Sequence, residues 1–232
     1  MRTVWRWCWR ALLLALFVVV AIQFWFFAQV AYWAKFNPSS TAFMRARLEI
    51  LREGNPNARL QHQWVPYQRI SPHLKRSLIA AEDAKFLDHH GFDWDGIRQA
   101  WARNRREGGI VAGGSTITQQ LAKNLFFSGQ RTWWRKGQEA VVAVMIEALM
   151  SKQRILEIYL NVIEWGDGVF GAQAAARYHH GGTAAGLSAQ QAAHLAAMTP
   201  SPRRYGPGAD TVYLRKRTAT ILARADAVRV PR

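Results

Sequence analysis

The chain of 232 residues is half hydrophobic, which leaves room for one globular domain of ordinary size plus an additional segment. Lys and Arg outnumber Asp and Glu by 31 to 15, and the formal net charge of +16 favours a polyanionic partner such as nucleic acid, anionic lipid or a phosphorylated substrate. The single cysteine, Cys8, excludes an intramolecular disulfide and gives no support to a structural zinc cluster or a thiol nucleophile.

The N-terminal part of the chain predicts a membrane anchor. Residues 11–34 carry no charge, and about 20 apolar residues are enough for a helix to cross the hydrocarbon core. Aromatic residues at both ends of this segment resemble interfacial belts, and no acid precedes it. Residues 1–10 are expected to be cytoplasmic, because they carry three positive charges, Arg2, Arg6 and Arg10.

A cleaved signal peptide is the alternative to this anchor. It would have a shorter apolar region, of roughly 7–15 residues, and a small-residue cleavage site, whereas the segment has no Ala-x-Ala pattern. We therefore expect an uncleaved, single-pass anchor with residues 35–232 outside the cytoplasm. That placement argues against nucleic acid as the polyanionic partner.

The remainder of the chain has helical periodicity almost throughout, with no repeats and no convincing alternation of strand residues, so we expect one mainly α domain. Ser188 and Gln191 fit a capping box, and that helix should end before Pro200. Residues 103–114 are basic and glycine-rich and predict a mobile loop, while residues 200–208 predict irregular chain. Other expected helix starts follow the capping residues Ser71, Asp93, Ser115, Thr132, Ser151 and Asp210.

The stretch "EDAKFLDHHG" at residues 82–91 gathers acids and histidines between two apolar segments. If a helix runs from Pro72 to about Asp88, Glu82 shares a face with Ile79 and Phe86, and a partly buried carboxylate is a better proton acceptor near neutral pH than a solvated one. His89 would lie on the same face. A charged helix face, a catalytic carboxylate and a metal site all remain open, although the spacing of the four metal candidates matches no ligand motif: Glu82, Asp83, His89 and His90.

Three later stretches each allow a functional and a structural interpretation. Residues 113–124 place glycines before a helix start, which is either an anion site or an ordinary N-cap. Residues 131–139 gather three cations around Glu139, which is either a ligand cluster or a solvated face. Residues 151–178 have the apolar spacing of a core helix, although Lys152 and Arg154 can point toward a ligand.

Four motifs in this order resemble the family of glycosyltransferases that polymerise peptidoglycan, represented by the transglycosylase domain of class A penicillin-binding proteins. "EDAKFLDHHG" is similar to the family's E-D-x-x-F-x-x-H-x-G, and "GGSTITQQLAKN" to its G-x-S-T-I-T-Q-Q-L-x-K-N. "RKGQE" is similar to R-K-x-x-E and "SKQRILEIYLN" to S-K-x-x-I-L-E-x-Y-L-N. The resemblance covers about residues 63–205, and since no transpeptidase domain follows, the monofunctional branch of the family is expected. Residues 178–182 and 198–202 depart from the family's aromatic-glycine and leucine-proline patterns.

The resemblance implies a mainly α, lysozyme-like, two-lobed domain that acts on lipid II, a disaccharide-pentapeptide on undecaprenyl diphosphate. It implies that Glu82 is the general base that deprotonates the acceptor 4-hydroxyl, and that an inverting attack forms a β-1,4 bond. Glu139 would orient the donor, and Lys123, Arg131 and Lys136 would offset the charge of the departing diphosphate. The other residues expected to bind or support the substrate are Asp83, Phe86, His89, Ser115, Thr116, Gln119, Gln120, Asn124, Arg135, Lys152 and Tyr159.

The resemblance also sets expectations for location and partners. It implies a bacterial inner-membrane protein with a periplasmic catalytic domain, which binds lipid II, the growing glycan strand and, as an open alternative, other cell-wall synthesis proteins. No metal site and no required cofactor are expected, and a divalent cation that assists the diphosphate stays open. A lysozyme-type hydrolase and a non-catalytic glycan- or lipid-binding module are the competing interpretations.

Overall fold

The computed structural model describes residues 2–109, 113–129 and 132–231, and it divides the chain into two compact units. The first unit, residues 1–37, consists of the helix α1 (Arg2–Lys35). Within it, Trp5–Lys35 spans 31 residues and contains an 18-residue window with a mean hydropathy of 2.6, so it is long and apolar enough to cross a membrane. This helix fits a single-pass membrane anchor and contains the predicted segment 11–34.

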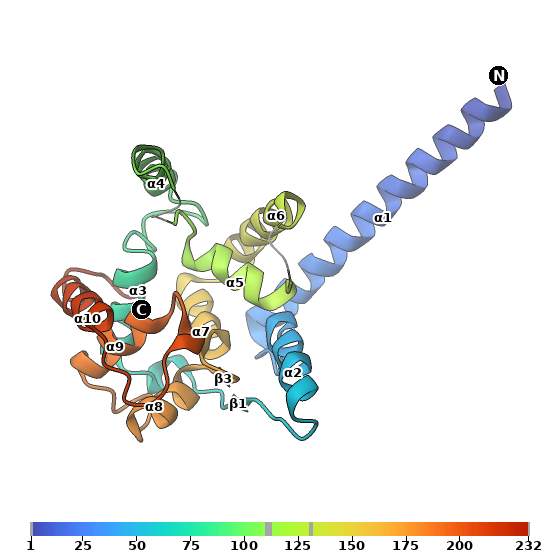
Figure 1. The fold of residues 1–232 in the computed structure, drawn as a ribbon. Coiled ribbons are helices and arrows are strands. Elements are labelled where there is room, and N and C mark those ends of the chain that lie inside the picture. Colours follow the sequence, from blue (N-terminus) through green and yellow to red (C-terminus); the bar gives the residue numbers. More distant parts are fainter. Residues whose placement is uncertain (1, 110–112, 130–131, 232) are drawn as a thin grey trace. The chain divides into compact units, whose positions relative to one another are not determined.

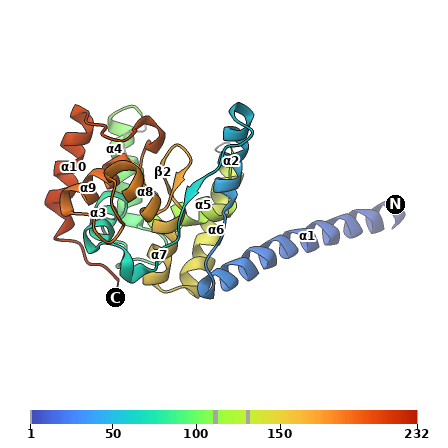
Figure 2. The same ribbon diagram turned by 90° about the horizontal axis from the view of Figure 1, so that it is seen from below.

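The second unit, residues 38–232, is mainly helical (Figures 1 and 2), as the sequence predicted. Its described helices are α2 (Ala42–Gly54), α3 (Pro72–Glu82), α4 (Trp94–Arg106), α5 (Ile117–Phe126), α6 (Trp133–Leu149), α7 (Lys152–Val162), α8 (Ala172–His180), α9 (Ala189–Met198) and α10 (Val212–Ala225). Two short 3₁₀ helices accompany them, η1 (Tyr67–Arg69) and η2 (Pro202–Arg204).

A small sheet that the sequence did not predict completes the unit. It is built from β1 (Gln61–His62), β2 (Glu164–Gly166) and β3 (Val169–Phe170), in the order β1-β3-β2. β1 runs parallel to β3, with Gln61 opposite Val169, and β2 runs antiparallel to β3 with a bulge between Glu164 and Gly166. Strands of two or three residues are too short to produce a detectable alternation in the sequence.

The helices form two packed groups. α3, α9 and α10 pack against one another, and α5 packs against α2, α6 and α7. The helix α7 is almost completely buried, from Ile155 to Val162, which confirms the predicted core spacing. It contacts α5, α6 and α8, so it forms part of the core on which the other helices are arranged.

Most of the predicted helix starts are confirmed. The side chains of Ser71, Asp93, Thr132 and Ser151 accept backbone hydrogen bonds at their helix starts, and Ser188 with Gln191 forms a capping box. Two were wrong by one residue. Thr116, rather than Ser115, caps α5, because it forms a capping box with Gln119. Thr211, rather than Asp210, caps α10, while Asp210 pairs with Arg215.

The predicted end of α3 was also wrong. The helix ends at Glu82 rather than near Asp88, because Asp83 leaves the helical conformation with φ −164° and ψ 73°. The Asp83 carboxylate accepts a hydrogen bond from the backbone N–H of Ile117 at 3.0 Å. Phe86 and His89 therefore lie beyond the helix and do not share a helical face with Glu82. Phe86 is nevertheless fully buried.

The predicted loops have a mixed outcome. Residues 103–106 of the expected mobile loop form the end of α4, and residues 110–112 lie outside the described residues. The segment predicted as irregular, 200–208, contains the short helix η2 and is otherwise irregular. It follows α9 directly, so its first residues lie beside the end of that helix.

Candidate active site

A cleft of about 700 Å³ lies where the end of α3 meets α5, α6 and the segment after α9. Glu82 enters it from α3, Gln120 and Lys123 from α5, and Glu139 from α6. The other residues that line it are Gly113, Ser115, Gln119, Thr132, Trp133, Arg135, Lys136, Thr199 and Pro200. The cleft therefore combines two carboxylates with several cations.

Glu82 is surrounded by groups from α5, from the C-cap of α9 and from α10. Its Oε2 accepts a hydrogen bond from Gln120 Nε2 at 2.8 Å, and its Oε1 lies 2.6 Å from the hydroxyl of Thr199. Arg217 on α10 is more distant, with Nη2 at 3.9 Å from Oε1. Within the described residues, the hydrogen bonds to this carboxylate come from neutral side chains.

Glu139 is in a different electrostatic environment. Its side chain is 4 % exposed and forms ion pairs with Arg135 and, at 3.3 Å, with Lys136. Lys136 Nζ also donates to Ser115 Oγ at 3.2 Å, which links α6 to the start of α5. Because a buried carboxylate is costly unless it is paired, these two ion pairs offset the cost of burying Glu139 and hold its side chain in place.

A second, smaller hollow of about 310 Å³ adjoins the first. The two share Gln120, Lys123, Thr199 and Pro200, so the boundary between them runs past Glu82's hydrogen-bond partners. The second hollow is also lined by Asn124 and Tyr159. Lys123 Nζ lies 5.8 Å from the ring centroid of Phe43 at this side.

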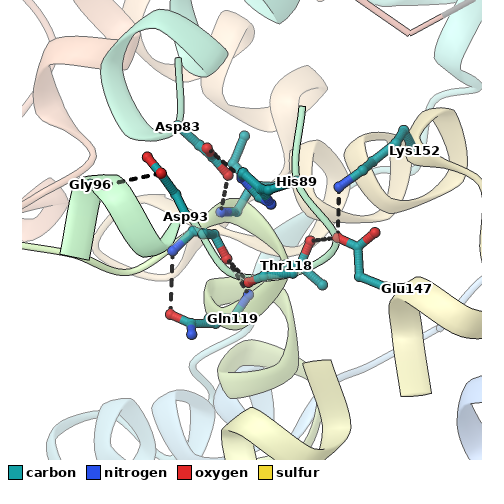
Figure 3. A network of polar contacts seen from close by, with 11 residues as sticks. Asp83, His89, Asp93, Gly96, Thr118, Gln119, Glu147 and Lys152 are labelled. Carbon is teal, nitrogen blue, oxygen red and sulfur yellow. Dashed lines mark hydrogen bonds and ion pairs between the residues drawn. The ribbon is translucent and has the colours of Figure 1, made fainter. Parts of the chain in front are cut away.

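A polar network supports the cleft from behind (Figure 3). Asp83 accepts hydrogen bonds from the Ile117 N–H and at 2.9 Å from His89 Nε2, and so ties the end of α3 to the start of α5. Glu147 on α6 accepts from Thr118 Oγ1 at 2.5 Å and from Lys152 Nζ at 2.8 Å. The network joins α3, α5, α6 and α7, and it fixes the elements that carry the cleft residues.

The buried tyrosine of α7 connects this support to Glu82. Tyr159 Oη donates to Gln120 Oε1 at 2.7 Å, while Gln120 Nε2 faces Glu82. Burial, with smaller contributions from the carboxylates of Glu82 and Asp83, raises the pKa of Tyr159 well above its usual value. The hydroxyl therefore stays protonated and remains a donor to Gln120 at physiological pH.

The structure separates the residues predicted for the site into three sets. Those lining the main cleft are Glu82, Ser115, Gln119, Gln120, Lys123, Arg135, Lys136 and Glu139. Asn124 and Tyr159 line the second hollow. Those that lie behind the cleft in structural contacts are Asp83, Phe86, His89, Thr116 and Lys152. Arg131 lies outside the described residues.

Several residues around Glu82 and the cleft were missed by the sequence analysis. Thr199, the C-cap of α9, and Arg217 on α10 reach Glu82, and Thr132 and Trp133 line the cleft at the start of α6. Thr199 lies in residues 198–202, which depart from the family's leucine-proline pattern. That departure was the one feature of the sequence that could have drawn attention to this residue. Among the described residues, no group of three or more His, Cys, Asp or Glu side chains is placed to hold a metal ion.

Comparison with known proteins identifies the family. A protein-family model described as "Transglycosylase" matches residues 49–226. The chain belongs to the transglycosylase family. This assignment confirms the family that the four motifs indicated, and the lysozyme-like, mainly helical fold expected for it.

Relatives of this transglycosylase match it over nearly their whole length. A protein of Nitrosospira multiformis named "Biosynthetic peptidoglycan transglycosylase" is 57 % identical over 226 residues, which cover 97 % of this chain and 98 % of that protein. Proteins of the same name from Methylobacillus flagellatus and Azoarcus sp. are 59 % and 60 % identical. They cover 96 % and 88 % of this chain, and 97 % and 89 % of their own length.

Proposed function

We propose that this transglycosylase is a peptidoglycan glycosyltransferase that polymerises lipid II into β-1,4-linked glycan and releases undecaprenyl diphosphate. The observation that carries the proposal is the pairing of Glu82 and Glu139 in one cleft with Lys123 and Lys136. Family membership and the names of the relatives support the peptidoglycan assignment. Two carboxylates around an anomeric carbon are also the arrangement of inverting glycosidases, with a sugar hydroxyl here in place of water.

The environments of the two carboxylates assign their roles. Both oxygens of Glu139 are engaged in ion pairs with Arg135 and Lys136, so this carboxylate suits the orientation of the donor. Glu82 is hydrogen-bonded by the neutral side chains of Gln120 and Thr199, with Arg217 farther away at 3.9 Å, and we assign it as the base. Glu82 takes the proton of the acceptor 4-hydroxyl, whose oxygen attacks the anomeric carbon from the face opposite the diphosphate. The bond to the diphosphate breaks, and the diphosphate leaves with the electron pair.

The cations of the cleft suit a diphosphate leaving group. Lys123 and Lys136 both line the cleft that holds Glu82. Hydrogen bonds from an ammonium to phosphate oxygens are roughly twice as strong as neutral ones, and they offset the charge that develops as the bond breaks. By the resemblance, Arg131 contributes to the same cluster. A lysozyme-type hydrolase releases no diphosphate and would have no use for this arrangement.

The anchor and the net charge suit a lipid-linked substrate. A spanning helix keeps the catalytic unit near the bilayer in which lipid II lies, and the net charge of +16 favours anionic headgroups. The excess of arginine before the helix supports a cytoplasmic N-terminus and a periplasmic catalytic unit. A divalent cation remains an optional assistant of the diphosphate in this proposal.

The decisive experiment is an assay of the purified full chain with lipid II in detergent or vesicles. We expect glycan strands with β-1,4 linkages and stoichiometric undecaprenyl diphosphate, with no fragments released from mature peptidoglycan. Parallel reactions with a chelator and with added Mg²⁺ test the divalent cation. Soluble fragments released from mature strands, without use of lipid II, would instead support a hydrolase.

A further inference from the structure

Thr199 presents one hydroxyl proton to two acceptors. The residue follows α9 as its C-cap, and its Oγ1 lies 2.6 Å from Glu82 Oε1 and 2.9 Å from the carbonyl oxygen of Ala196. A carboxylate and a carbonyl both accept hydrogen bonds, whereas a threonine hydroxyl can donate only one. When Glu82 is ionised, one of these two acceptors is without the Thr199 proton.

The Ala196 carbonyl needs this donor for a reason that lies in the sequence. In an α-helix that carbonyl would accept from the N–H four residues later, and that residue is Pro200, which has no N–H. Ala196 is fully buried, so its carbonyl lies where an unpaired polar group is costly. Thr199 keeps helical backbone angles, φ −53° and ψ −31°, which bring its hydroxyl back to the last turn of the helix.

The other oxygen of Glu82 restricts where a proton can be held. Oε2 accepts from Gln120 Nε2 at 2.8 Å, and an amide nitrogen donates but does not accept. A proton on Oε2 would point at the N–H of Gln120, so two donors would face each other with no acceptor between them. A protonated Glu82 is therefore best accommodated with its proton on Oε1, where the oxygen of Thr199 can accept it.

We propose that Thr199 is a positioning residue whose hydroxyl reverses its hydrogen bond as Glu82 changes protonation state. This rests on the proposed role of Glu82 as base. With Glu82 ionised, Thr199 donates to Oε1 and leaves the Ala196 carbonyl unpaired. Once Glu82 has taken the proton of the acceptor hydroxyl on Oε1, it donates to Thr199, and the Thr199 hydroxyl turns to Ala196. No proton is gained or lost at Thr199.

The consequence is a coupling between the end of α9 and the proton affinity of Glu82. The missing N–H of Pro200 favours the protonated state of Glu82, because only in that state is the Ala196 carbonyl satisfied. A donor added at position 200 should remove this bias. The other charged or titratable groups around the pair stay unchanged in the test: Asp83, Lys123, Arg135, Lys136, Glu139, Tyr159 and Arg217.

The test is a double-mutant cycle in the full chain, read from the acidic limb of kcat/KM for lipid II polymerisation, which reports the base of the free enzyme. Pro200→Ala supplies an N–H to Ala196, and we expect the acidic limb to move to lower pH by roughly half a unit to one unit. In a Thr199→Val background the same substitution should leave the limb unmoved. Pro202→Ala changes a proline of the second hollow that lacks this geometry, and it should not move the limb either.

Thr199→Val alone should lower the rate by roughly tenfold, because Glu82 loses a partner in both protonation states, and Thr199→Ser should restore it. A Pro200→Ala limb that does not move, or that moves equally without the hydroxyl, overturns the inference. If Thr199→Val does not fold, Pro200→Ala and Pro202→Ala still decide it. Wild-type polymerisation by Glu82→Gln would overturn the assignment of Glu82 as the base. If Glu82→Gln is inactive but Pro200→Ala leaves the acidic limb unmoved, only the role of Thr199 is overturned.

Discussion

The hydroxyl of Tyr159 donates to Gln120 Oε1 at 2.7 Å, and this bond fixes the end of the Gln120 amide that faces Glu82. Tyr159→Phe removes the donor and leaves the amide free to turn its oxygen toward the carboxylate. We expect polymerisation to slow by roughly tenfold and the free energy of unfolding to fall by about 0.5–1.5 kcal/mol, the net contribution of one hydrogen bond. Rates with lipid II and urea titrations measure both effects.

Tyr213→Phe is the matched control for this change. Tyr213 lies on α10 with 51 % of its surface exposed, so loss of its hydroxyl should alter neither rate nor stability. A Tyr159→Phe enzyme that is less stable but polymerises at the wild-type rate would show that the tyrosine supports only the fold.

Glu82→Gln tests the proposed base directly. The amide keeps the shape of the side chain but cannot take up a proton, and loss of general-base catalysis typically lowers the rate by about 10²–10⁴-fold. The fold should be retained, because the new amide oxygen can accept from Gln120 while its nitrogen donates to Thr199. Glu53→Gln, an exposed acid on α2, should remain fully active. Comparable rates for the two variants would contradict the assignment.

Lys123→Ala tests the proposed diphosphate contact. Because a charge-assisted hydrogen bond to phosphate contributes strongly, we expect kcat/KM for lipid II to fall by roughly 10–100-fold, with an unchanged melting temperature. Lys216→Ala removes an exposed lysine on α10 and should leave turnover as it is. Equal turnover by both variants would show that Lys123 does not bind the diphosphate and acts only as a surface charge.

The sequence was sufficient where the determinants are local. Caps such as Ser71 and Ser188 act on residues two or three positions away, and the apolar spacing of α7 follows from its own residues. The family motifs, each a short run of residues, single out Glu82, Lys123 and Glu139, which line one cleft in the structure. Each of these features can be recognised within a short window of sequence.

The sequence was insufficient where the partner is distant in the chain. α3 ends early because the Asp83 carboxylate accepts a hydrogen bond from the N–H of Ile117, 34 residues away. No nearby residue in the sequence indicates this bond. Thr199 meets Glu82 across 117 residues, in a segment without a recognised motif. His89 was expected beside Glu82 from helical periodicity, and the turn after Glu82 instead directs it to Asp83.

The predicted topology can be tested with reporters. Arg2, Arg6 and Arg10 precede an apolar helix, so the N-terminus should stay in the cytoplasm and Arg232 should lie outside it. A reporter that is active only outside the cytoplasm should work when fused after Arg232, and a cytoplasmic reporter should be silent there. The reverse pattern would place the catalytic unit on the other side of the membrane and contradict the periplasmic assignment.

Two neighbouring histidines predict how stability depends on pH. Burial, with a smaller contribution from His194, lowers the pKa of both His179 and His180 below the usual value of 6.5. The unfolded chain therefore binds these protons at a higher pH than the folded chain does. The contribution of these two histidines to the free energy of unfolding is fully present above pH 6.5. It is lost as the pH falls from 6.5 toward their lowered pKa values.

The melting temperature of the full chain should thus be constant from about pH 8 to about pH 7 and fall toward about pH 5. His180→Gln removes one titrating group and should flatten part of that fall, because glutamine cannot take up the proton. His73→Gln changes a histidine on α3, away from this cluster, and serves as the control. A melting temperature that falls equally in all three proteins would show that other groups, rather than His180, govern stability in this pH range.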